Sequence, residues 1–140
     1  MIQNFEQGAR EAGKDPSQMS HMIEINVGYG GNIEAEIQEQ LKYWAGTYIP
    51  ALFNQKIYTP AMSAENGAVI GADIVKKTGC FSNDAREQIQ YVQQHLELGF
   101  DTIIVHSAGP DQKGFIESYA RDILPQIRSA QARPAMAHTH

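Results

Sequence analysis

His106 is the residue of this sequence best placed to do chemistry. It ends the apolar run Thr102–His106 and is followed by Ser107. Such a run is typical of a parallel strand buried on both faces, and parallel α/β proteins bind ligands at the carboxyl ends of their strands. An imidazole there could act as an acid, a base or a hydrogen-bond donor. A structural histidine bonded to a neighbouring backbone group is an equally weighted alternative.

Three lysines could bind an anion. Lys56 lies in a long segment without periodicity, and Lys76 and Lys77 stand just before a short predicted strand. A cation in a loop that folds over the end of a strand can bind a phosphate or a carboxylate. On the residues alone, solvated surface lysines are the favoured alternative.

The glycine-rich turn Gly28–Gly31 follows a predicted strand and precedes a predicted helix. Glycines let backbone N–H groups approach an anion at a helix N-terminus. The dinucleotide pattern needs a third glycine where this sequence has Ile33, and no Lys-Ser or Lys-Thr pair follows. An ordinary tight turn is therefore favoured over a phosphate site.

Other reactive side chains lack the surroundings that chemistry would require. Ser107 is not within a G-x-S-x-G turn, and Cys80 has no basic neighbour in sequence. His21 and His95 have no partner at metal-ligand spacing, so no metal site is expected.

Composition limits the class of protein. The 11 basic and 16 acidic residues give a formal charge of −5, which offers no general attraction to nucleic acid or to an anionic membrane. No stretch approaches the ~18 apolar residues of a membrane helix, and no basic segment leads into an apolar one at the N-terminus. We expect a globular cytoplasmic domain.

Strands and helices alternate along the chain. We expect strands over 22–27, 78–81 and 102–106. Helices are expected over 2–12, over 33–45 with Asn32 as N-cap, from the cap cluster 82–84 to Gly99, and from the loop 107–111 through Ile127. We expect an irregular segment over 46–76 and a disordered tail over 129–140. This order requires parallel strands joined by helical crossovers. Three strands cannot close a barrel, so the chain resembles a piece of a larger fold.

Residues 2–128 resemble luciferase-like oxidoreductases, and within them the coenzyme F420-dependent enzymes of the glucose-6-phosphate dehydrogenase type. The segments that carry the resemblance are Ala12–Asp15, Met22–Ile25, Tyr43–Ala45, Val105–Gln112 and Asp122–Pro125. The resemblance implies an α/β fold that is part of a (β/α)8 TIM barrel, with about three parallel strands and flanking helices. The chain would be the C-terminal portion, carrying strands six, seven and eight, and 46–76 would be an insertion.

The resemblance also implies roles for individual residues. The segment at Trp44 and Thr47 is similar to one that contacts the deazaflavin. Lys56 and Lys77 correspond to basic residues that hold the sugar phosphate, although the relatives have arginine at position 77. The proton donors and acceptors of the family belong to its N-terminal half, so this chain alone is expected to be catalytically incomplete.

The implied reaction is hydride transfer to coenzyme F420 from a hydroxyl-bearing carbon, such as that of a phosphorylated sugar. An FMN-dependent monooxygenase with FMN as cofactor is the alternative within the family. Outside enzymology, the chain could be a binding module or complementing subunit that pairs with an N-terminal half or a second copy of itself. A small nucleotide-binding protein using Gly28–Gly31 is the remaining alternative.

Overall fold

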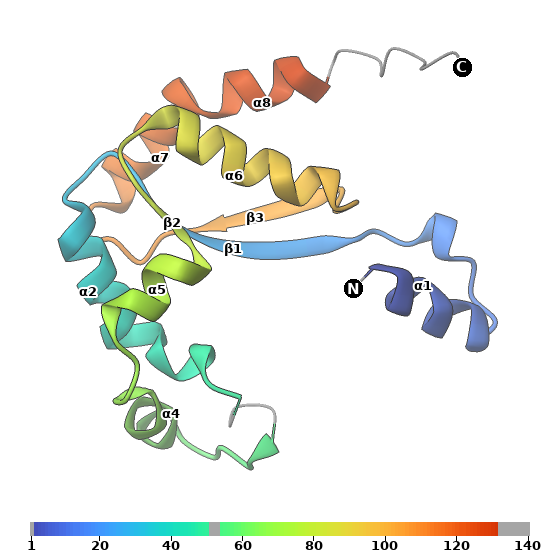
Figure 1. Ribbon diagram of the computed structural model, residues 1–140, viewed down its shortest axis with the longest axis horizontal. Helices are drawn as coiled ribbons and strands as arrows, with labels where there is room; N and C mark the ends of the chain where they lie inside the picture. Colours follow the sequence, from blue (N-terminus) through green and yellow to red (C-terminus); the bar gives the residue numbers. More distant parts are fainter. Residues whose placement is uncertain (1, 51–53, 132–140) are drawn as a thin grey trace.

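The computed structural model describes residues 2–50 and 54–131 (Figure 1). Its elements are α1 (Ile2–Glu11), η1 (Pro16–Gln18), β1 (Met22–Gly28), α2 (Ile33–Trp44), η2 (Ala45–Tyr48), α4 (Pro60–Gly67), α5 (Ala72–Thr78), β2 (Cys80–Phe81), α6 (Ala85–Glu97), β3 (Thr102–His106), α7 (Gln112–Asp122) and α8 (Leu124–Gln131). The predicted α/β class with three parallel strands and flanking helices is confirmed.

The order of the strands is β2-β1-β3, with β1 in the centre. β1 pairs with β3 over five residues and with β2 only through Val27 and Gly28. Successive strands of a (β/α)8 barrel are neighbours, so three of them would place β2 between the other two. The observed order therefore differs from that of three successive barrel strands, and the assignment of these strands as six, seven and eight stays a prediction. β1 and β3 are the neighbouring pair, and β2 is a two-residue extension on the other side of β1.

One face of the β1–β3 pair is covered by helices. Ile25 and Val27 point into a core shared with Val92 of α6, Tyr119 of α7 and Ile123 between α7 and α8. In Figure 1, α6 and α8 lie on this side of the strands, whereas α2, η2 and α4 extend away on the other side. The sheet is thus closed by helices on one face.

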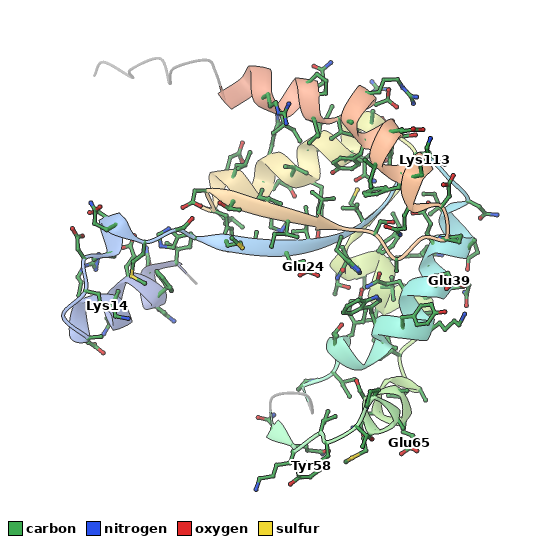
Figure 2. The ribbon with its side chains drawn as sticks, turned by 180° about the vertical axis from the view of Figure 1, so that it is seen from behind. Lys14, Glu24, Glu39, Tyr58, Glu65 and Lys113 are labelled. Atoms are coloured by element: carbon green, nitrogen blue, oxygen red, sulfur yellow. The ribbon has the colours of Figure 1, made fainter. Side chains whose placement is uncertain are left out.

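The opposite face is open. Strand residues alternate between faces, so Glu24 and Asn26 point away from the core, and Figure 2 shows Glu24 on the side remote from α8. Ile104 of β3 is 44% exposed. The prediction that Thr102–His106 is buried on both faces is wrong, because no helical layer covers this side of the described sheet.

Side-chain caps set the starts of the longer helices, as predicted. Asn32 Oδ1 accepts from the backbone N–H of Ala35 at 3.1 Å at the start of α2. Asp84 Oδ1 does the same for Arg86 at 2.8 Å at the start of α6. Each cap satisfies one of the N–H groups that a helix start leaves without a partner.

Residues 46–50 and 54–76 contain several helices, so the expectation of an irregular segment over 46–76 is corrected for the described part of it. It contains most of η2, all of α4 and most of α5. Thr59 caps α4 and Pro60 occupies its first turn, a common way to begin a helix. α4 packs directly on η2, since a Cβ added to Gly67 would lie 2.5 Å from the backbone nitrogen of Gly46. The strand expected at 78–81 is only Cys80–Phe81, because α5 continues to Thr78.

The last helix is two helices. α7 ends before Ile123, and α8 begins at Leu124 and contains Pro125, which cannot donate a hydrogen bond to the preceding turn. α8 continues to Gln131, so the tail expected from 129 begins later; residues 132–140 lie outside the described residues. Across 2–50 and 54–131, no helix is long and apolar enough to cross a membrane.

Candidate functional site

Three side chains meet at the carboxyl end of the open sheet face. Asn26 and His106 are register partners on β1 and β3, and Nδ1 of His106 lies 2.9 Å from Oδ1 of Asn26. The Trp44 ring meets the imidazole edge-on, with ring centroids 4.7 Å apart and an interplanar angle of 71°. We call Asn26, Trp44 and His106 the strand-mouth cluster.

Trp44 reaches the cluster because α2 ends there. Trp44 is the last residue of α2, and its carbonyl accepts a hydrogen bond from Thr47 Oγ1 at 2.8 Å within η2. That bond satisfies a carbonyl that the helix end would leave free. Trp44 is 40% exposed, so part of its surface is accessible to a ligand. Of the predicted site residues, Trp44 therefore contacts both Thr47, through its backbone carbonyl, and His106, through its ring.

The two predicted phosphate ligands lie apart from these contacts. Lys56 and Lys77 are both exposed, and neither forms a hydrogen bond or an ion pair with the residues that the structure describes. Lys77 is in the last turn of α5, where the neighbouring Lys76 pairs with Glu34 at 3.5 Å. The structure leaves both ammonium groups free to bind an anion but does not assemble a site around them.

The glycine-rich turn is occupied by a side chain. Asn83 accepts from the N–H of Gly30 at 2.8 Å and donates to the carbonyl of Gly31 at 3.0 Å. Gly30 has a φ of +84°, which a residue with a Cβ would adopt at a cost. Because the Gly30 N–H already has a partner, the geometry favours the tight turn over a phosphate cradle.

Sequence reasoning missed a buried carboxyl group close to the strand ends. Glu36 of α2 is 6% exposed, and Cβ atoms added to Gly28 or Gly109 would lie 2.5 Å from its Oε2 and 2.8 Å from its Cγ. Burial raises the pKa of Glu36, and a hydrogen bond from the backbone of Tyr29 opposes that rise. The signal in the sequence was a set of glycines in two strand-end loops, which make room for one larger side chain.

Gln88 was also missed. It is fully buried on α6, and its Nε2 lies 2.8 Å, 3.1 Å and 2.9 Å from the carbonyl oxygens of Gly28, Cys80 and Ser82. This one amide joins the end of β1 to β2 and its following loop. Nothing in the local pattern distinguishes it from the exposed glutamines of the same helix.

The remaining reactive groups add no second centre. Burial raises the pKa of the Cys80 thiol to about 11, so the thiol is protonated at neutral pH and is a poor nucleophile. Within 2–50 and 54–131, no group of three or more His, Cys, Asp or Glu side chains is arranged to hold a metal ion.

Comparison with known proteins identifies relatives over most of the chain. No protein-family model matches the sequence. An F420-dependent glucose-6-phosphate dehydrogenase of Mycolicibacterium gilvum is 27% identical over 128 residues, covering 91% of this chain and 38% of the relative. A second such enzyme, from Rhodococcus jostii, is 28% identical over 88% of this chain and 36% of the relative.

A solved structure agrees. An F420-dependent secondary alcohol dehydrogenase, in complex with an F420-acetone adduct, matches with a TM-score of 0.77 and 30% identity over 91% of this chain and 38% of that one. The chain is thus similar to F420-dependent dehydrogenases over about nine tenths of its length. It spans less than two fifths of the length of these relatives. The resemblance to F420-dependent enzymes of the luciferase-like fold is confirmed, whereas the roles of Trp44, Thr47, Lys56, Lys77 and His106 stay predictions.

Proposed function

We propose that this chain forms part of an F420-dependent dehydrogenase that oxidises a hydroxyl-bearing carbon of a small molecule. The observation that carries the proposal is the structural match over 91% of the chain to an enzyme solved with an F420-acetone adduct. That enzyme is named an alcohol dehydrogenase and the sequence relatives are named glucose-6-phosphate dehydrogenases. Both names describe dehydrogenation of a carbon that bears a hydroxyl group.

The strand-mouth cluster has the chemistry that such a site needs. The accessible part of the Trp44 indole offers a flat apolar surface on which a flat ring system can rest. Bound coenzyme F420 would supply the hydride acceptor. Trp44 and Thr47 would contact its ring, and His106 would hydrogen-bond to the substrate on the same sheet face. The contribution of these residues is to orient the reactants and to exclude water.

The two lysines would recognise a phosphate on the substrate. Lys56 and Lys77 are exposed and without ion pairs among the described residues, so their charge is available. Lysine binds phosphate as a point charge and without the planar fork of arginine. Replacing Lys77 by alanine should weaken binding of glucose 6-phosphate while leaving binding of glucose unchanged.

The described sheet needs further strands beside it to enclose a binding site. β3 is at its edge, and on the open face Met22 is 57% exposed. An unpaired edge beside exposed apolar side chains is a place where another strand pairs. We therefore propose that a complementing polypeptide, or a second copy of the chain, supplies parallel strands at this edge. The cytoplasmic location expected from the sequence stays a prediction.

A titration of the chain with coenzyme F420, followed by the fluorescence of the coenzyme, tests the proposal. Saturable binding that is stronger for F420 than for FMN is the expected result. Trp44→Ala should weaken it about two- to tenfold, the loss of one aromatic contact, whereas Tyr43→Ala, the neighbouring exposed aromatic, should not.

Two outcomes would contradict this function. Stronger binding of FMN would favour the flavin-dependent alternative. Absence of binding in a sample that light scattering shows to be associated would mean that the chain does not form the coenzyme site.

A further inference from the structure

The contacts of His106 decide which of its nitrogens carries the proton. The atom 2.9 Å from Nδ1 is the amide oxygen of Asn26, which can only accept a hydrogen bond. Nδ1 must therefore be the protonated nitrogen. In the neutral ring Nε2 is then an acceptor, and it has no hydrogen-bond partner among the described residues.

Two elements fix the orientation of this ring. Asn26 and His106 are paired residues of neighbouring strands, so their backbones are held by the β1–β3 ladder. Trp44, from the end of α2, blocks rotation of the imidazole from another direction. The Nδ1–H form is thus imposed by the fold and exists before any ligand binds.

We infer that Asn26 is a positioning residue that presents Nε2 of His106 as a hydrogen-bond acceptor for the hydroxyl group of the substrate. An alcohol can donate to this nitrogen, but the corresponding ketone has no hydrogen to donate. The pair would therefore favour the alcohol over the ketone and help the oxidised product to leave. The identity of the ligand rests on the proposed dehydrogenase function, whereas the protonation pattern is a property of the chain alone.

The first experiment is nitrogen-15 NMR of the imidazole rings of the chain in mildly alkaline buffer without coenzyme. His106 is expected as Nδ1–H. Asn26→Ala should shift it toward Nε2–H, whereas Asn26→Asp, whose carboxylate still accepts a hydrogen bond, should retain Nδ1–H.

His95 provides an internal control. Its Nδ1 lies 2.8 Å from the backbone carbonyl oxygen of Tyr91, so it should be Nδ1–H in every variant. If the protonated nitrogen of His95 changes in Asn26→Ala, that variant has a disturbed fold. The unmodified chain is then compared with Asn26→Asp instead. His106 as Nε2–H in the unmodified chain, or unaffected by Asn26→Ala in a chain with an unchanged His95, would overturn the inference.

The second experiment compares propan-2-ol with acetone as probes of the same nitrogen. The alcohol should move the Nε2 resonance of His106 in a concentration-dependent way, and acetone should move it much less. Equal responses, or none, would remove the role in substrate recognition. Because neither measurement uses coenzyme F420, failure of the coenzyme titration alone would count against the proposed function and leave the positioning role of Asn26 intact.

Discussion

The two faces of the β1–β3 pair are built from the same strands and serve different purposes. On the covered face, Ile25 and Val27 pack against α6, α7 and α8 and are almost fully buried. On the open face, the residues that alternate with them along the strands include Asn26 and its register partner His106, and Ile104 is 44% exposed. The fold is therefore stabilised on one side, which leaves the other side free to carry polar residues that a core would not tolerate.

The largest expected effect contrasts two isoleucines. Ile123 is fully buried against the covered face, so Ile123→Ala should lower the free energy of unfolding by about 2–5 kcal/mol. Ile104→Ala on the open face should cost about 1 kcal/mol or less, because its side chain already contacts water. Urea unfolding of both variants measures the difference. Equal losses would mean that the open face is covered in solution and that the contrast between the faces is wrong.

A smaller effect concerns the amide that joins β1 to β2. Gln88→Ala should cost about 1–3 kcal/mol, since it removes a buried donor shared by three carbonyl groups. Gln90 lies exposed on the same helix, and Gln90→Ala is the matched control, expected within about 0.5 kcal/mol of the parent. If both variants unfold at the same urea concentration, the contacts of Gln88 contribute nothing to stability.

The smallest effect depends on pH. Burial raises the pKa of Glu36 above its ordinary value of 4.5, so the folded chain retains this proton more strongly than the unfolded chain does. Its stabilising contribution is present below pH 4.5 and is lost as the pH rises through the raised pKa. Glu36→Gln, which cannot ionise, should therefore gain stability relative to the parent at neutral pH and lose that gain in acid.

Glu34, two residues before Glu36 on the same helix and exposed, is the control of opposite sign. Hydrogen bonding from Gln38 and the charge of Lys76 lower its pKa. Glu34→Gln should therefore remove a small stabilisation at neutral pH, and this loss should disappear as the pH falls through the lowered pKa. Thermal unfolding of both variants from acid to neutral pH measures these changes in stability. If both substitutions change the stability in the same direction as the pH rises, the burial of Glu36 is contradicted.

The elements with strong local signals could be predicted from the sequence, and those set by distant contacts could not. Asn32 before an apolar stripe predicts α2, and runs of β-branched residues predict β1 and β3. The helices α4 and α5 have eight and seven residues, too few to show a clear period, and only Thr59-Pro60 signals the first of them. The position of β1 between β2 and β3 depends on pairing across more than 50 residues, which no local pattern encodes.

The site divides in the same way. His106 could be predicted because a strand end is a local feature. Its partner Asn26 is 80 residues away, and only the register of β1 against β3 brings the two together. The burial of Glu36 could not be predicted, because its side chain fills space that is left by the absence of side chains at Gly28 and Gly109.

The edge-on contact between Trp44 and His106 gives the chain a built-in optical reporter. Trp44 is its single tryptophan, so all indole emission arises within the strand-mouth cluster. A charged imidazole against the ring would quench that emission, and a bound chromophore beside it would draw the excitation away by energy transfer. With excitation selective for tryptophan, which avoids the tyrosines of the covered core, events at the open face can thus be followed in the unlabelled chain.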